Sequence, residues 1–99
     1  MKEYSIKSAA DFWNDLDSAL NYIAYEKVNP SAARKLYDKV IAKIETLKFA
    51  PRINLIKDDL YSTKVGHYKI IYQVIDSGSI VKLLHFWYAR RDIRKLLDI

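Results

Sequence analysis

Hydrophobic and polar residues alternate along two stretches near the end of the chain, residues 68–75 and 80–88. A period of two is typical of β-strands with two unlike faces. The residues expected on the more apolar face are Tyr68, Ile70, Tyr72, Val74, Val81, Leu83, His85 and Trp87. The turn-forming sequence Asp-Ser-Gly-Ser at residues 76–79 separates the two stretches, which therefore predict a β-hairpin.

The other face of this hairpin is expected to stay partly open. If the register is unbroken, the second strand presents Lys82, Leu84, Phe86, Tyr88 and Arg90 on that face. Such a face combines aromatic rings with positive charge. His85, on the more apolar face, is expected to be a packed or hydrogen-bonded histidine of the core.

The first helical pattern covers residues 9–26, where apolar residues recur at a spacing of three and four. Its predicted inward stripe is Phe12, Leu16, Ala19, Leu20 and Ile23. Ser8 is the predicted N-cap, with Asp11 three residues later in the position of a capping box. The acidic residues Asp11, Asp15 and Asp17 are expected to form an ordinary solvated face.

The second helical pattern starts at Asn29 and Pro30, a predicted N-cap followed by proline at the first helical position, and ends near Phe49. Its predicted inward stripe is Ala33, Leu36, Tyr37, Val40, Ile44 and Leu47. The outer face carries Arg34, Lys35, Lys39 and Lys43, which we interpret as solubilising charge. The short link to the first helix predicts an antiparallel helical hairpin.

Short apolar stretches at residues 4–6, 53–57 and 60–65 predict further strands, and residues 91–99 predict a short C-terminal helix. The order of these elements defines an α+β domain. We expect an N-terminal strand and an α-helical hairpin packed on a mainly antiparallel sheet of about four strands. Residues 1–99 are expected to form a single domain, because the chain is too short for two.

Composition places the chain among folded globular domains, with 51% hydrophobic residues and no cysteine. No signal peptide and no apolar run of membrane-spanning length is present, so we expect a cytoplasmic protein that does not insert into membranes. The net charge of +5 is uneven: residues 1–59 hold 10 Lys and Arg against 9 Asp and Glu, whereas residues 60–99 hold 7 against 3. A basic, aromatic sheet suits either phosphate binding or an acidic partner segment.

The sequence YKIIYQVID, followed by a hydrophobic strand and WYARRD, resembles the closing hairpin of the RelE/ParE superfamily of bacterial toxins. The segment LKFAPRI at residues 47–53 and the two helices extend the resemblance. It implies the toxin of a type II toxin–antitoxin system, with a ribosome-dependent, metal-independent mRNA endonuclease as the first hypothesis. The alternatives are a non-enzymatic poison of DNA gyrase and an inactive family member. The implied partners are a cognate antitoxin and mRNA on the ribosome, or gyrase, in a homodimer or a toxin–antitoxin heterotetramer.

The resemblance also implies site residues. Lys69 and Arg90 stand at phosphate-handling positions of the family, and Tyr88 stands where many members carry His in an H-x-R-R-D pattern. Cleavage by a 2′-hydroxyl needs a proton acceptor, a proton donor and cations around one phosphate. The family's C-terminal Tyr corresponds to Leu96 here, which leaves Tyr88, His67 or His85 as candidates for the acid–base role. The predicted catalytic residues are Lys69, Arg90 and Tyr88. The predicted RNA-binding residues are Lys64, His67, Arg91 and Lys82, with no cofactor and no metal.

Overall fold

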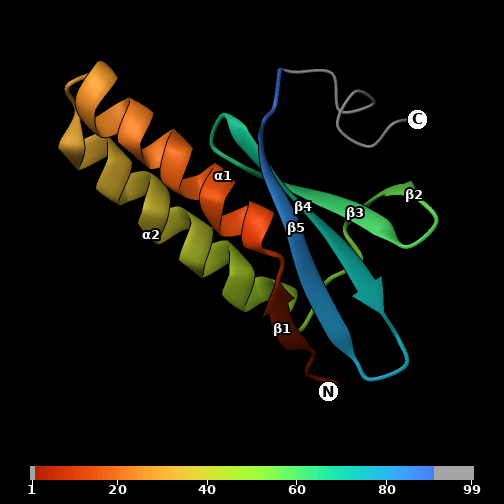
Figure 1. The fold of residues 1–99 in the computed structure, drawn as a ribbon. Coiled ribbons are helices and arrows are strands. Elements are labelled where there is room, and N and C mark those ends of the chain that lie inside the picture. The colour runs from red at the N-terminus through yellow and green to blue at the C-terminus, as the bar shows by residue number, and fades with distance from the viewer. Residues whose placement is uncertain (1, 91–99) are drawn as a thin grey trace.

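The computed structural model describes residues 2–90 (Figure 1). The elements are β1 (Ser5–Ser8), α1 (Ala10–Asn21), the π-helical turn η1 (Tyr22–Glu26), α2 (Pro30–Leu47), β2 (Asn54–Lys57), β3 (Leu60–Val65), β4 (Tyr68–Ile75) and β5 (Ile80–Tyr88). The predicted C-terminal helix at residues 91–99 lies outside the described residues. Within the described part of the chain, no helix is both long and apolar enough to cross a membrane.

The sheet has five strands in the order β1-β5-β4-β3-β2. Neighbouring strands from β2 to β5 are antiparallel, and β1 lies parallel to β5. The helical hairpin covers one face of this sheet (Figure 1). The predicted α+β architecture is confirmed, with one strand more than expected because β1 joins the edge of the sheet.

The start of α1 differs from the prediction. Ser8 belongs to β1 and is in register with Leu83, so the predicted cap at Ser8 is wrong. Ala9 takes the N-cap position without a side-chain hydrogen bond, and its N–H donates to the Leu83 carbonyl at 2.8 Å. The ladder with β5 therefore holds Ser8 in extended conformation, where its hydroxyl cannot cap the helix.

The predicted start of α2 is confirmed. Pro30 is the first helical residue, and the Asn29 side-chain oxygen accepts a hydrogen bond from the Ala32 N–H at 3.1 Å. The predicted stripe is buried except for Tyr37, which is exposed. Because Tyr37 lies about 100° around the helix from the buried Leu36, it points past the core.

The core lies between the helical hairpin and the sheet. Phe12 and Leu16 of α1 and Val40 and Leu47 of α2 belong to one buried cluster with residues of the sheet. Ala19, Leu20 and Ile23 complete the predicted stripe of the first helix as partly buried residues. The sheet contributes the buried residues Val65, Ile70, Tyr72, Val74, Val81, Leu83 and Phe86.

A β-bulge at Leu84 changes the register of the central hairpin. Tyr72 pairs with Leu83, whereas Ile71 pairs with His85, so Leu84 has no partner on β4. One extra residue reverses the alternation of side chains beyond it. Phe86 is consequently only 4% exposed and belongs to the core. The prediction that Phe86 and Tyr88 share the open face with Lys82 is therefore wrong.

Candidate functional site

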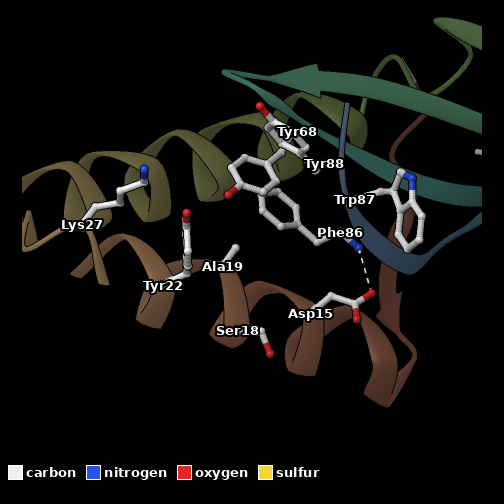
Figure 2. A pocket seen from close by; sticks show the side chains of 9 residues that line it. All are labelled: Asp15, Ser18, Ala19, Tyr22, Lys27, Tyr68, Phe86, Trp87 and Tyr88. Carbon is white, nitrogen blue, oxygen red and sulfur yellow. Dashed lines mark hydrogen bonds between the residues drawn. The ribbon is translucent and has the colours of Figure 1, made fainter. Parts of the chain in front are cut away.

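A pocket with a volume of about 630 Å³ lies where the open end of the β4–β5 hairpin, at Tyr68 and Tyr88, meets α1 and η1 (Figure 2). The bulge at Leu84 creates its aromatic character, because it turns the last residues of β5 toward the helices. The lining residues are Asp15, Ser18, Ala19, Tyr22, Lys27, Tyr68, Phe86, Trp87 and Tyr88.

Three rings from the sheet form the floor of this aromatic pocket. Phe86 stacks on Tyr68 with ring centroids 4.8 Å apart, and Tyr88 meets Tyr68 edge-on at 5.5 Å. Phe86 also contacts Phe12 of α1 edge-on at 6.3 Å, which ties the floor to the core. Such geometries are favourable for aromatic pairs beyond the area that they bury. The floor is therefore a fixed aromatic surface.

The π-helical turn η1 supplies the outer wall. The Lys27 N–H donates to the Tyr22 carbonyl at 3.0 Å, five residues back, as a π-helical turn requires. This wider turn brings both residues to the pocket, and the Lys27 ammonium lies 5.7 Å from the centre of the Tyr22 ring. Tyr22 remains 49% exposed. The wall thus offers an accessible ring beside a positive charge (Figure 2).

Asp15 lines the pocket, and its surroundings correct the prediction that it belongs to a solvated face, whereas Asp11 and Asp17 are exposed as predicted. One carboxylate oxygen accepts a hydrogen bond from the Phe86 N–H at 3.3 Å and lies 3.2 Å from His85 Nδ1. β1 pairs with β5 only as far as Leu83. Beyond that point the Asp15 carboxylate, in place of a strand, accepts the hydrogen bond from the Phe86 N–H. His85 is hydrogen-bonded as predicted, at this edge rather than within the apolar core.

The three residues predicted to be catalytic do not share one face. Tyr88 is in register with Tyr68 and lines the aromatic pocket. Lys69 follows Tyr68 on β4, so alternation directs its side chain to the opposite face, where it is in register with Trp87 and Lys64. Arg90 is exposed in the turn after β5.

The predicted RNA-binding residues are also divided. Lys64 is exposed beside Lys69, and the His67 carbonyl accepts a hydrogen bond from the Ala89 N–H at 2.9 Å. Lys82 is in register with Lys7 and Gln73 near the other end of β5, roughly 20 Å along the strand from Tyr88. Arg91 lies outside the described residues. The structure therefore gathers Lys64, His67 and Lys69 at one end of the sheet and separates Lys82 from them.

The ionisable groups with shifted pKa values lie at the other end of the sheet. The Arg52 guanidinium donates to the Tyr4 hydroxyl at 2.8 Å and bonds the Asp76 carboxylate. The hydrogen bond from Arg52 holds the pKa of Asp76 below its ordinary value, and the same bond raises the pKa of Arg52. Burial raises the pKa of Tyr72 to about 12. These contacts fix the helix exit to the hairpin turn and are structural.

The sequence interpretation missed the helix side of the pocket. Tyr22 and Lys27 stand outside the predicted inward stripe, and their position at the pocket depends on a π-helical turn that has no clear sequence signal. The sequence feature that could have identified Tyr22 is its position immediately before Ile23, a residue of the predicted apolar stripe. Among residues 2–90, no three His, Asp or Glu side chains are grouped as metal ligands.

Solved structures place the fold among bacterial and archaeal toxins. A chromosomal ParDE system from P. aeruginosa matches with a TM-score of 0.70 and 15% identity, over 89% of this chain and 98% of that one. The archaeal RelE–RelB complex from Pyrococcus horikoshii OT3 matches with a TM-score of 0.64 and 21% identity, over 91% of this chain and 99% of that one. A mutant E. coli RelE toxin in the free state matches with a TM-score of 0.61 and 19% identity, over 89% of this chain and 85% of that one. The architecture is that of the RelE/ParE superfamily.

The sequence assigns the chain more narrowly within this class. A profile of the ParE toxin of the type II toxin–antitoxin system parDE matches residues 6–93. The chain belongs to this family of ParE toxins, which confirms the predicted superfamily and the general role as a toxin. No curated protein sequence matches it.

Proposed function

We propose that this toxin acts by protein contact, as a poison of DNA gyrase, and that the aromatic pocket is its contact surface. The observation that carries the proposal is the bulge at Leu84, which builds the pocket and separates Tyr88 from Lys69. The match to ParE toxins supports the gyrase alternative over the mRNA endonuclease that the sequence first suggested.

The chemistry of RNA cleavage explains why this separation matters. A 2′-hydroxyl attack requires the proton-transfer groups and the stabilising cations to reach the same phosphate, at hydrogen-bonding distance. Tyr88 faces the helices with Tyr68, whereas Lys69 lies on the opposite face of β4. The two side chains have the sheet between them, so they are poorly placed to act on one phosphodiester.

The composition of the pocket suits a protein partner. Cores of protein interfaces are enriched in Tyr, Trp and Phe and depleted in charged residues. The pocket has this character, with an accessible Tyr22, a fixed Phe86 floor and only Asp15 and Lys27 as charged lining residues. Asp15 is already engaged by the Phe86 N–H and His85, so Lys27 is the charge that remains to orient a partner carboxylate.

We also propose a cognate antitoxin as a partner. One of the similar structures is a RelE–RelB complex, and another belongs to a ParDE system. Co-expression with a small acidic protein from the same operon is expected to yield a stable complex. A dissociation constant weaker than about micromolar, roughly −8 kcal/mol, would count against this partner.

A ribosome-dependent mRNA endonuclease is the second candidate. Lys64 and Lys69 are neighbours in register and His67 lies in the turn between their strands, so this end of the sheet offers charge for an RNA backbone. The proton-transfer group would then have to come from His67 or from residues outside 2–90, with Tyr88 only indirectly involved.

Two assays on the same preparation of toxin separate the candidates. The toxin is added to a supercoiling reaction with purified gyrase and, separately, to a translating extract in which mRNA ends are mapped. We expect inhibited supercoiling with accumulated broken DNA, and intact mRNA. Ribosome-dependent cleavage of mRNA together with unaffected gyrase would refute the proposal and restore the endonuclease hypothesis.

A further inference from the structure

A second hollow, of about 320 Å³, lies between α2 and the end of β3. Three of its lining residues are lysines, Lys39 and Lys43 of α2 and Lys64 of β3. The remaining lining residues are small or carry little polarity: Ala42, Thr46, Val65 and Gly66. We call this hollow the lysine groove.

The three lysines of the groove lack carboxylate partners within residues 2–90. The two acidic residues of α2 are engaged elsewhere: Asp38 bonds Arg34, and Glu45 bonds Lys48. Lys39 and Lys43 are four residues apart, where like charges on a helix repel each other. Lys43 is also half-buried. Three cations around one hollow, with no carboxylate partner among the described residues, make it an attractive site for an anion.

The surrounding surface extends this charge along the helix. Lys35 precedes Lys39 by four residues, so Lys35, Lys39 and Lys43 follow one side of α2 over about 12 Å of helix rise. On the sheet side, Lys69 is in register with Lys64. Lys69 lies on the sheet face away from the helices and does not line the groove, so the charge around the groove runs along one side of α2 to Lys64 at the end of β3 and is not a single isolated point.

The chemistry of the groove favours phosphates over an acidic protein segment. Lysine acts as a compact point charge for phosphate, and nucleic-acid backbones are bound mainly by such contacts. Protein interfaces, in contrast, are depleted in Lys and depend on aromatic anchors. The lysine groove has no aromatic lining residue, unlike the aromatic pocket.

We propose that the lysine groove binds the phosphodiester backbone of nucleic acid without sequence specificity, through Lys39, Lys43 and Lys64. This replaces the interpretation of the α2 lysines as solubilising charge. The inference goes beyond the proposed contact with gyrase and does not depend on it, because the groove and the aromatic pocket share no lining residue.

The test measures binding of the purified toxin to a short labelled duplex DNA, and to single-stranded RNA of the same sequence, by fluorescence anisotropy as salt is raised from about 50 to 200 mM. Removing two phosphate contacts, with Lys39→Ala and Lys43→Ala together, is expected to reduce the slope of log K against log salt by about 2 for the duplex. Comparison of the two probes shows whether the source is DNA or RNA.

A matched control removes the same charge elsewhere. Lys7 on β1 and Lys57 on β2 are exposed on the two edge strands, away from the groove. Lys7→Ala with Lys57→Ala should leave the slope nearly unchanged, and both double variants should keep the wild-type thermal midpoint. Equal slopes for the wild type and the groove variant would overturn the proposal, as would equal losses in both double variants. Tighter binding of polyglutamate than of either nucleic acid would instead assign the groove to acidic proteins.

Because this assay contains no gyrase, a failure of the groove leaves the gyrase proposal intact. Conversely, a toxin that binds nucleic acid through the groove but spares gyrase would refute only the proposed function.

Discussion

The aromatic pocket and the lysine groove flank the same helical hairpin, yet their chemistry differs in every respect. The pocket lies beside α1 and η1 and is built from stacked rings, with its acidic residue already hydrogen-bonded. The groove lies beside α2 and β3 and holds three lysines without a counter-charge. Rings that bury apolar area suit a folded protein partner, whereas unpaired ammonium groups suit phosphates.

This contrast teaches how a small domain can separate two kinds of recognition. The sheet is the common support: β4 and β5 carry the pocket floor, and β3 carries Lys64. The bulge at Leu84 makes the separation possible, because it moves Phe86 and Tyr88 to the helix side while Lys69 stays with Lys64. With an unbroken register, rings and charges would have shared one open face.

The largest effect is expected for the pocket floor. Phe86 is buried against Phe12 and Tyr68, so Phe86→Ala should reduce the free energy of unfolding by about 3 to 5 kcal/mol. Tyr88→Ala, at the rim, should cost much less, because Tyr88 is partly exposed. Denaturant titration of both variants measures the difference. Similar small losses would mean that Phe86 lies on the open face and that the bulge is absent.

A reference region that belongs to neither surface sharpens the comparison. Tyr72 donates a hydrogen bond to the Pro51 carbonyl, and burial raises its pKa to about 12, against about 10 in an unfolded chain. Below pH 10 both states keep the proton, so this contribution to stability is complete. As the pH rises from about 10 to 12, the unfolded state ionises first, and stability should fall by roughly 2 to 3 kcal/mol.

The measurement is the free energy of unfolding across this alkaline range for the wild type and Tyr72→Phe. The variant should show a shallower loss, although it lacks the hydrogen bond to Pro51. It should also leave gyrase inhibition and nucleic-acid binding at neutral pH unchanged. An equally steep loss in Tyr72→Phe would show that another group titrates in its place.

A smaller effect is expected at the start of α2, which lies next to the pocket wall and far along the helix from Lys43. Asn29 caps the helix through the Ala32 N–H, so Asn29→Ala should cost about 1 kcal/mol, and Asn29→Asp should retain most of the stability. Thermal unfolding measures this. The salt slope of nucleic-acid binding should stay constant in both variants, whereas a change would couple the two regions.

Much of this fold could be predicted because its signals are local. Asn29 and Pro30 mark the helix start because the first N–H groups of a helix lack backbone partners, so a capping side chain is favoured there and proline is tolerated. The strand β3 is marked by alternating residues between Asp59 and Gly66. The prediction of Ser8 as the N-cap was wrong because pairing with Leu83 holds Ser8 in a strand despite its capping propensity. Local propensity decides an element only where no tertiary contact competes.

The candidate site was less predictable for the same reason. The bulge at Leu84 carries no glycine, and Asp15 stabilises it from a helix that lies far away in the sequence. The π-helical turn that places Tyr22 at the pocket likewise has no recognisable sequence pattern. Prediction therefore found Tyr88 and Lys69 as residues of interest, but it could not tell that the sheet separates them.

The most direct test of the account compares gyrase inhibition by the wild type, Tyr22→Ala and Lys69→Ala at matched stability. If protein contact through the aromatic pocket disables gyrase, Tyr22→Ala should raise the half-inhibitory concentration by at least about tenfold, the equivalent of roughly 1.4 kcal/mol. Lys69→Ala should inhibit as the wild type does. Loss of toxicity in Lys69→Ala with full potency in Tyr22→Ala, accompanied by mRNA cleavage by the wild type, would contradict the account.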